Sequence, residues 1–365
     1  MRILLLSAYD AVSHRYWREG LVNAFPDHDW TTLTLPPRYF AWRIRGNSLS
    51  WAFNERATLQ ASYDLVIATS MVDLTGLRGL VPTLAAIPTL VYFHENQFAY
   101  PASGREFKSV EPQMLNLYNA LAADHVLFNS DFNRRTLLDG ARSLLRKLPD
   151  QVPTGLVERI EARSQVVPVP LPDQVFLPHT PQNGPLQLIW NHRWEFDKGP
   201  EQLLAAITAM QQRQIAFTLH VVGQQFRHTP DLFDHIRAQL QQGDNLGHWG
   251  HIESVDDYRR LLQQGDVVLS TALHDYQGIA VLEGVAAGCT PVVPDRLAYT
   301  ELFAAEYRYA TDNEAEALAE QIAALASSKA AGQPLPCPDI SALGWSSLTS
   351  TYRHAMTYTL AAPRV

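Results

Sequence analysis

The chain has 365 residues and a formal net charge of −8 at pH 7, with 46% hydrophobic and 18% charged residues. This length predicts two domains, and this balance excludes disordered, collagen-like and low-complexity chains. The acidic charge argues against a protein coated by nucleic acid, although it is compatible with a local basic patch.

Short aliphatic runs alternate with amphipathic stretches along the chain, which is the pattern of α/β proteins. The first half predicts strands at 2–7, 30–35, 64–69, 89–93, 125–129 and 165–168, and helices at 14–25 and 131–147. The second half predicts strands at 186–190, 217–222, 246–250, 267–270 and 291–294. Its helices are expected at 200–212, 230–241, 255–263, 278–287 and 313–327. Two successive series of similar size predict two doubly wound sheets rather than one barrel.

A proline-rich segment over residues 166–178 separates the two series. Four prolines within it favour a stiff, extended linker. We therefore expect an N-terminal domain over 1–170 and a C-terminal domain over 171–344. A last helix within 345–362 could pack back on the first domain.

The compartment is indicated by the cysteines and the apolar runs. Cys289 and Cys337 are too few for a disulfide framework or a cysteine-based zinc site, which favours the cytosol. The apolar run at 3–6 is shorter than the core of a signal peptide. No apolar stretch approaches the ~20 residues that span a bilayer. The sequence therefore predicts a cytoplasmic protein without stable membrane insertion.

Polar residues follow the predicted strands in both halves, where open parallel sheets bind their ligands. In the first half these are Ser13, His14, Ser70, His94, Glu95, Asn96, Gln97 and Ser130. In the second half they are Asn191, His192, Arg193, Gly223, His251, His274 and Asp275. This pattern predicts a polar cleft between two α/β domains.

The segment 274–293 carries the strongest chemical signal. It leaves a strand and opens a helix near Gly278, and the unpaired N–H groups of a helix start suit a phosphate. Asp275 and Glu283 stand eight positions apart, so they could hold the hydroxyls of a sugar and of a ribose on either side of an anion. The alternative is a solvated loop aspartate and an ordinary helix glutamate.

A second strand-to-helix loop carries Arg193 and Lys198. An arginine fork and a lysine point charge at this spacing can clamp a diphosphate, and surface charges at a turn are the alternative. No P-loop sequence occurs, and no Gly-x-Gly-x-x-Gly follows the first strand.

His94 and Glu95 follow the apolar strand at 89–93. A zinc-protease motif would need histidine at 98, where Phe98 stands, so we reject that site and predict no metal. His94 could contact a sugar or orient an acceptor hydroxyl, and Asn96 and Gln97 could bind the acceptor. Loop residues with satisfied hydrogen bonds are the alternative.

Residues 38–45 form the most basic and aromatic stretch of the chain. Arg38, Trp42, Arg43 and Arg45 suit phosphate contacts and base stacking. The alternative is a loop that covers apolar surface with arginine stems packed on it.

The second half resembles the donor-binding half of retaining, nucleotide-sugar-dependent glycosyltransferases of the GT-B fold. The resemblance lies in Asp275-x7-Glu283, the run from Glu283 to Val292 and the pair Arg193 and Lys198. It implies two Rossmann-like domains across a cleft, with Glu283 on the ribose, Asp275 on the sugar, and Arg193 and Lys198 on the diphosphate. It further implies donor contacts from the backbone of Gly278, Ile279, Ala280, His251 and Ile252.

The first half resembles the tRNA-queuosine mannosyltransferase family more specifically. The matching segments are 3–9 with Ser13 and His14, 35–45, 92–101 and 128–133, and the likeness extends over roughly residues 1–305. It implies an enzyme without metal or other cofactor that moves mannose from GDP-mannose to the queuosine base of tRNA-Asp. The residues that it implies are catalytic His94, donor-binding Ser13 and His14, and acceptor-binding Arg38, Trp42, Arg43, Arg45, Glu95, Asn96, Gln97 and Ser130.

This sequence departs from the family at two places. The family's Gly-Gly before Ser-His is Ala11-Val12 here, and its Glu-Phe-Phe-Gly is Asp275-Tyr-Gln-Gly278. These departures keep open a non-catalytic tRNA-binding protein with a relict donor cleft, whereas the retained Arg193, Lys198 and Glu283 oppose it. A glycan or lipid acceptor, another donor, or a sugar-nucleotide epimerase of the same architecture are further alternatives.

Overall fold

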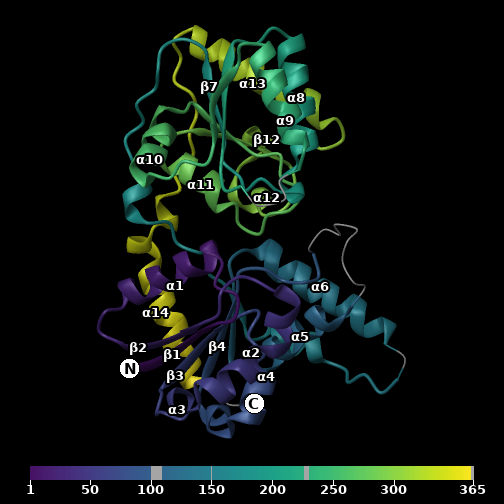
Figure 1. Ribbon diagram of the computed structural model, residues 1–365, viewed down its shortest axis with the longest axis vertical. Coiled ribbons are helices and arrows are strands. Elements are labelled where there is room, and N and C mark those ends of the chain that lie inside the picture. The colour runs from purple at the N-terminus through teal and green to yellow at the C-terminus, as the bar shows by residue number, and fades with distance from the viewer. Residues whose placement is uncertain (100–108, 149, 226–229, 363–365) are drawn as a thin grey trace. The chain divides into compact units, whose positions relative to one another are not determined.

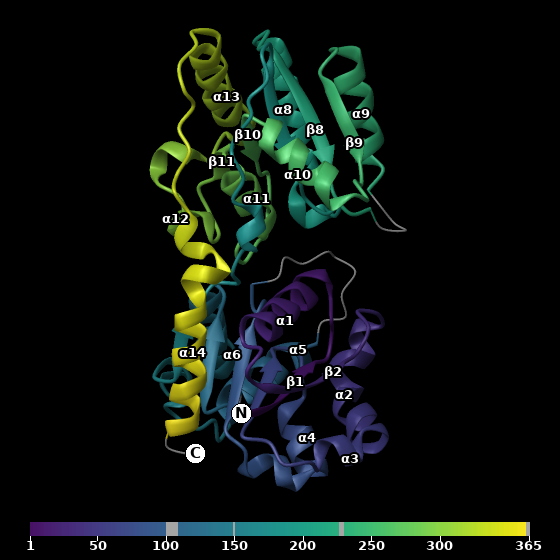
Figure 2. The same ribbon diagram turned by 90° about the vertical axis from the view of Figure 1, so that its left-hand side faces the viewer.

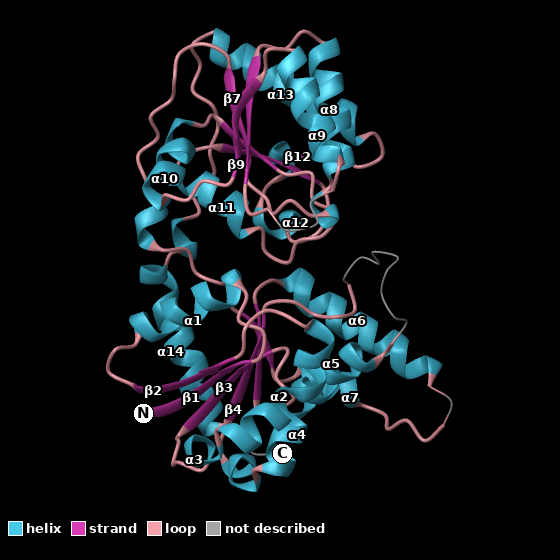
Figure 3. Ribbon diagram, in the orientation of Figure 1, coloured by secondary structure: helices cyan, strands magenta, loops and turns pink. Residues whose placement is uncertain are grey.

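The computed structural model describes residues 1–99, 109–148, 150–225 and 230–362. The chain divides into two compact units, one formed by Met1–Pro170 with Trp345–Val365 and the other by Leu171–Gly344. We call them unit 1 and unit 2. Each is built on a parallel six-stranded sheet flanked by helices (Figures 1 and 3). Within the ranges that the structure covers, no helix has both the length and the apolar character needed to cross a membrane.

Unit 1 holds a sheet with the strand order β2-β1-β3-β4-β5-β6. Its strands are β1 (Arg2–Ser7), β2 (Asp29–Thr34), β3 (Leu65–Thr69), β4 (Thr89–Phe93), β5 (His125–Phe128) and β6 (Ser164–Val166). All pairings are parallel, and the register places Leu4 beside Val66. The inner strands are continuous apolar runs because helices cover both faces of the sheet.

Alternate strand residues of unit 1 face two helical layers. Leu4, Val66 and Val91 pack in one apolar cluster with α2 (Phe40–Asn54), α4 (Leu74–Leu80) and α5 (Glu111–Ala122). On the opposite face the ring of Tyr92 stacks on Trp17 of α1 (Val12–Ala24). The remaining helices of this part of the chain are α3 (Arg56–Leu59), α6 (Asp131–Lys147), α7 (Leu156–Glu161) and a 3-10 turn at Pro82–Ala86.

The last helix, α14 (Trp345–Ala361), belongs to unit 1 and runs beside its sheet (Figure 2). The indole N–H of Trp17 donates to the hydroxyl of Tyr352 at 3.0 Å, and this hydroxyl donates to the carbonyl of Pro168 at 2.9 Å. Trp345 fills the space beside Gly20, where an added Cβ would lie 2.5 Å from the indole ring. The helix is therefore held on the sheet by buried hydrogen bonds as well as by apolar packing.

Unit 2 holds a sheet with the order β12-β11-β10-β7-β8-β9. Its strands are β7 (Leu186–Trp190), β8 (Phe217–Val222), β9 (Leu246–Gly250), β10 (Val267–Leu269), β11 (Thr290–Pro294) and β12 (Arg308–Tyr309). Its helices are α8 (Pro200–Gln212), α9 (Leu232–Gln242), α10 (Val255–Gln264), α11 (Ile279–Ala286), α12 (Tyr299–Leu302) and α13 (Glu314–Ala330). Two apolar clusters cover the two faces of this sheet.

Candidate active site

Lys198 connects two strand-to-helix loops of unit 2. It closes the 3-10 turn at Phe196–Lys198 after β7, and it is only 7% exposed. Its Nζ donates to the carbonyl oxygen of His274 at 2.7 Å, and lies 3.2 Å from Asp197 Oδ2 and 3.6 Å from Asp275 Oδ2. One buried ammonium thus holds the loop after β7 against the loop after β10.

The close approach of these loops requires glycine at position 199. Gly199 has φ +67°, and an added Cβ would lie 2.0 Å from the carbonyl oxygen of Thr271. The hydroxyl of Thr271 donates to the carbonyl of Lys198 at 2.9 Å. Pro200 then begins α8, a position where the missing N–H of proline costs nothing.

Arg193 presents a second cation nearer to the surface. Its side chain is 45% exposed and forms ion pairs with Glu195 at 2.5 Å and Asp197 at 3.7 Å. Asp197, which is 1% exposed, therefore lies between the two cations. The pair Arg193 and Lys198 is brought together by the structure, with a buried carboxylate between its members.

Asp275 is held as an anion. Its Oδ1 accepts from the backbone N–H of Gly278 at 2.9 Å, and its Oδ2 accepts from the hydroxyl of Tyr299 at 3.3 Å. Burial alone would raise the pKa of Asp275, but the charge of Lys198 and the hydrogen bond from Gly278 hold it at about 2. An ionised carboxylate at this position can accept hydrogen bonds from sugar hydroxyls.

Two histidines beside this cluster are neutral. Burial, followed by the charge of Lys198, lowers the pKa of both His192 and His274 to about 4. Neutral imidazoles add no further positive charge to the loops, so Lys198 and Arg193 supply the cationic character of this part of unit 2.

Helix α11 begins beside Asp275. Its N-cap, Gly278, has φ +72°, and an added Cβ there would lie 2.7 Å from the ring of Tyr299. The first-turn N–H groups of Ile279 and Ala280 have no acceptor within the helix. They lie at the positive end of the helix dipole, which favours an anion.

Glu283 lies about one turn into α11. Its Oε2 accepts from the hydroxyl of Tyr258 in α10 at 2.9 Å. Burial raises the pKa of Glu283 to about 7, while Tyr258 and the nearby Arg259 act in the opposite direction. His251 and Ile252 follow β9 at the end of the sheet, with His251 exposed and Ile252 partly buried.

Unit 1 gathers a second polar cluster at the carboxyl ends of β3 and β4. His14 Nε2 lies 2.9 Å from Glu95 Oε2, and the hydroxyl of Ser70 donates to Glu95 Oε1 at 3.1 Å. The rings of His14 and His94 stack with centroids 4.2 Å apart. Burial, followed by the charge of His14, lowers the pKa of His94 well below 6.5.

Three predicted acceptor residues take part in scaffold contacts. Asn96 is fully buried and donates to the carbonyl and amide oxygens of Asn133, while its own Oδ1 accepts from the N–H of Phe98. Ser130 caps α6 by accepting from the N–H of Asn133 at 3.0 Å. The backbone N–H of Gln97 donates to Asn116 at 2.7 Å. Ser13, by contrast, is exposed in the first turn of α1. Residues 100 and 101, the last two of the family-like segment 92–101, lie outside the described residues.

The basic aromatic stretch at 38–45 leads into helix α2. Tyr39 and Trp42 are 74% and 51% exposed, and the guanidinium of Arg38 lies 5.8 Å from the ring centroid of Tyr39. Arg45 pairs with Glu111. Arg43 differs, because it is buried and its Nε donates to the carbonyl of Pro36 at 3.1 Å, so it fixes the loop instead of offering a free cation.

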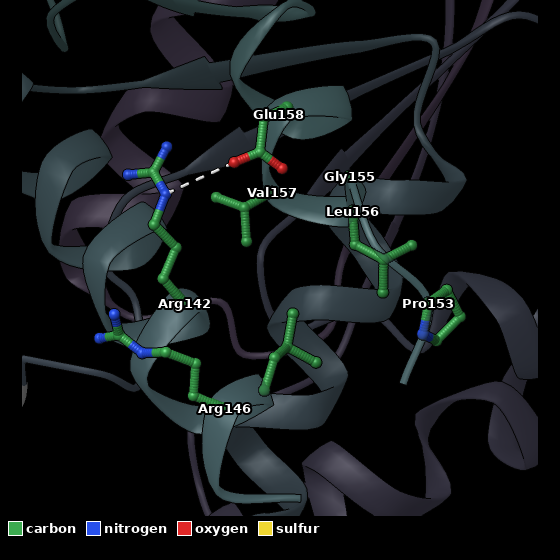
Figure 4. A pocket seen from close by; sticks show the side chains of 8 residues that line it. Arg142, Arg146, Pro153, Gly155, Leu156, Val157 and Glu158 are labelled. Atoms are coloured by element: carbon green, nitrogen blue, oxygen red, sulfur yellow. Dashed lines mark ion pairs between the residues drawn. The ribbon is translucent and has the colours of Figure 1, made fainter. Parts of the chain in front are cut away.

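A surface pocket on α6 and α7 contains none of these residues (Figure 4). Two cationic side chains, Arg142 and Arg146, line it, and Arg142 pairs with Glu161 at 2.8 Å and with Glu158 at 3.8 Å. Across the residues that the structure describes, no group of three or more His, Cys, Asp or Glu side chains could hold a metal ion.

The sequence did not single out Tyr258, Tyr299 or Asp197. Asp197 stands directly before the predicted site residue Lys198, so its position in the sequence could have identified it. The two tyrosines come from α10 and α12, and nothing in their spacing relates them to Glu283 or Asp275. Their roles depend on how these short helices pack beside α11.

Comparisons with known proteins agree on one family. Residues 2–171 match the family model described as tRNA-queuosine alpha-mannosyltransferase N-terminal, and residues 177–333 match glycosyl transferases group 1. A tRNA-queuosine alpha-mannosyltransferase of Drosophila melanogaster is 33% identical over 321 residues, which cover 85% of this chain and 84% of that protein.

Solved structures share the fold at lower identity. Sucrose-phosphate synthase of Thermosynechococcus elongatus superposes with a TM-score of 0.67 at 13% identity, covering 100% of both chains. HepE of Anabaena, crystallised with UDP, superposes with a TM-score of 0.61 at 12% identity, covering 98% of this chain and 100% of that one. The two parallel six-stranded sheets are those of the GT-B fold, as the sequence predicted.

Proposed function

Because the chain belongs to the tRNA-queuosine alpha-mannosyltransferase family, we propose that it transfers mannose from GDP-mannose to the queuosine base of tRNA-Asp with retention of configuration. The name of the relative from Drosophila melanogaster gives the mannosyl group and the tRNA queuosine, and the GDP-mannose donor and tRNA-Asp belong to this proposal. The observation that best supports the donor half of this proposal is the buried Lys198, whose Nζ contacts both the His274 carbonyl and the carboxylate of Asp275.

Unit 2 would bind the donor. Lys198, Arg193 and the first-turn N–H groups of Ile279 and Ala280 would surround the diphosphate, with Gly278 giving the backbone room to approach it. Glu283 would accept from the ribose hydroxyls, and Asp275 from the mannose. The backbone of His251 and Ile252 would contact the base.

The chemistry is the exchange of one bond to the anomeric carbon. The bond between this carbon and the diphosphate oxygen breaks, and its electron pair leaves with the diphosphate. The acceptor hydroxyl forms the new bond from the same face, and its proton passes to the departing phosphate, so no carboxylate base is needed. Preorganised cations beside the developing charge usually supply the largest part of such catalysis.

Unit 1 would receive the acceptor. The family resemblance assigns His94 to the transferred sugar, and Ser13 and His14 to donor binding. Glu95 and Gln97 would lie near the acceptor, with Asn96 and Ser130 holding their loops. On α2, Arg38, Trp42 and Arg45 would meet the tRNA through phosphate contacts and stacking. We place the enzyme in the cytoplasm, because its two free cysteines agree with a reducing compartment.

The ionised Asp275 favours an active enzyme over a relict cleft. Aspartate is one methylene shorter than the family's glutamate, yet hydrogen bonds from Gly278 and Tyr299 still fix it beside Lys198. A functionless cleft gives no reason to keep a buried cation beside one buried and one partly buried carboxylate, which is costly to maintain.

The test supplies GDP-mannose labelled in the mannose to queuosine-containing tRNA-Asp and to the same tRNA without queuosine. We expect label only in the first tRNA. Equal labelling of both would contradict the proposed acceptor, and labelling of neither by a folded protein that binds GDP would contradict the acceptor class.

A further inference from the structure

Both acidic residues of the donor site contact a tyrosine hydroxyl from a neighbouring helix. Tyr258 of α10 donates to Glu283 Oε2 at 2.9 Å, and Tyr299 of α12 donates to Asp275 Oδ2 at 3.3 Å. Neither tyrosine belongs to the Asp275-x7-Glu283 segment. Tyr299 also shares a 2.9 Å hydrogen bond with Ser270, whereas Tyr258 contacts a residue that has no other assigned role, Asn191.

Asn191 determines the direction of the Tyr258 hydroxyl. Its Nδ2 donates to the carbonyl of Ala280 at 2.7 Å and to the Tyr258 oxygen at 2.9 Å. A backbone carbonyl only accepts, so the amide must present nitrogen and not oxygen on this side. With its oxygen accepting from Asn191, the Tyr258 hydroxyl directs its own proton to Glu283.

The same hydroxyl is a permanent donor. Burial, followed by the nearby charge of Glu283, raises the pKa of Tyr258 well above 10. Tyr258 therefore engages one carboxylate oxygen, Oε2, over the whole physiological range and leaves Oε1 for a ligand. A fixed carboxylate loses less rotational freedom when it binds a diol than a free one would.

We propose that Tyr258 is a positioning residue for the donor, which fixes Glu283 so that Oε1 receives the ribose hydroxyls, and that Asn191 fixes Tyr258 in turn. This inference rests on the proposed function, because that function assigns the ribose to Glu283.

The proposal predicts a pH signature that a purely structural tyrosine would lack. The groups that act on Glu283 are Tyr258 and Arg259 of α10, both of which favour its ionised form, and Cys289 acts on Tyr258 in turn. Removal of the hydroxyl should raise the pKa of Glu283 from about 7 to a higher value. Because the ionised form binds the ribose best, GDP affinity should then be lost near neutral pH and regained at higher pH.

The experiment measures GDP binding by calorimetry from about pH 6 to about pH 9 for the wild type, Tyr258→Phe, Glu283→Gln and Tyr309→Phe. Tyr309→Phe is the matched control, because this hydroxyl donates to the carbonyl of Ser270 and contacts neither acid. We expect Tyr258→Phe to weaken GDP binding about tenfold near pH 7 and to move the pH midpoint upward. In transfer assays it should raise KM for GDP-mannose more than it lowers kcat, and Tyr309→Phe should follow the wild type.

Three outcomes separate the possibilities. If Tyr258→Phe leaves both the GDP affinity and its pH midpoint unchanged while Glu283→Gln weakens GDP binding, the inference is overturned and the proposed donor site stands. A loss that is equal at every pH, or that Tyr309→Phe shares, assigns Tyr258 a structural role and also overturns it. Wild-type affinity in Glu283→Gln, or no GDP binding by the folded wild type, overturns the proposed donor site itself.

Discussion

Lys198 Nζ lies 3.6 Å from Asp275 Oδ2, although the two residues come from different strand-to-helix loops of unit 2. Asp197 Oδ2 lies 3.2 Å from the same ammonium, so one buried cation faces a buried carboxylate, Asp197, and a partly buried one, Asp275. Arg193 adds a second cation at the edge of this group. A diphosphate would meet a preformed arrangement of charges there, which needs little reorganisation when charge develops on the leaving group.

Replacing Lys198 by alanine should lower turnover at least tenfold, about 1.4 kcal/mol of transition-state stabilisation. The leaving group would lose one of the two cations assigned to it, and Asp275 would lose the charge that most depresses its pKa. Initial rates of mannose transfer measure this. Lys329→Ala is the control, because this lysine pairs with Asp266 outside the candidate site. Wild-type turnover in a folded Lys198→Ala protein would contradict the assigned role.

Glu283→Gln should stabilise the ligand-free protein while weakening GDP binding. The pKa of Glu283 is about 7 in the folded chain against an ordinary 4.5, so the unfolded state ionises first as pH rises. Stability is therefore lost between these two values, and the loss stays constant above about pH 7. The substitution should raise the free energy of unfolding by on the order of 1–2 kcal/mol at about pH 8 and should leave it unchanged below about pH 4.5.

Thermal unfolding at these two pH values measures that difference. A gain in Tm that is the same at both would contradict the cause given, because it would not depend on ionisation. Together with weaker GDP binding, a gain confined to the higher pH would identify Glu283 as a residue kept for the ligand at the expense of stability.

Glu95→Gln should slow mannose transfer about tenfold and change GDP affinity less, because Glu95 acts on the donor only through His14, and a loss confined to the transfer step lowers the rate and not GDP binding. The carboxylate holds His14 at 2.9 Å and accepts from Ser70, so its loss releases the orientation of an imidazole that stacks on His94. Calorimetry with GDP and single-turnover transfer separate the two effects. Equal losses in both would place this cluster in nucleotide binding instead.

Arg38 and Arg45 should differ from Arg43 in what they affect. The double change Arg38→Ala with Arg45→Ala should weaken tRNA binding about tenfold at low salt and reduce the salt slope by about one unit or more. Arg43→Ala should instead lower Tm, because its Nε supports the carbonyl of Pro36 from a buried position. Filter binding of tRNA over a series of salt concentrations tests the double change. An unchanged dependence of tRNA affinity on salt would exclude this surface from the tRNA contact.

The sequence predicted the strands well and some helices poorly, for a physical reason. β1, β4, β7 and β8 occur at the predicted residues, because buried parallel strands are continuous apolar runs bounded by polar ones. Helices α2, α4 and α5 were not predicted, and neither was the two-residue strand β12. Helix α2 carries exposed aromatics together with a buried arginine and asparagine, which obscures the apolar stripe that identifies a helix.

The candidate site was predictable where it lies at strand ends. Lys198 and Asp275 could be expected near each other because both follow parallel strands of one sheet. The contact of Tyr258 with Glu283 could not, since it depends on the packing of α10 against α11. The scaffold role of Asn96 and the burial of Arg43 likewise depend on neighbours that spacing does not reveal.

The most direct test of the central claim is nucleoside mass spectrometry of queuosine-containing tRNA after incubation with the protein and GDP-mannose. The account predicts that queuosine gains the mass of one hexose with the wild type and gains none with Lys198→Ala. Queuosine that stays unmodified, with a wild type shown to be folded and to bind GDP, would contradict the proposed reaction.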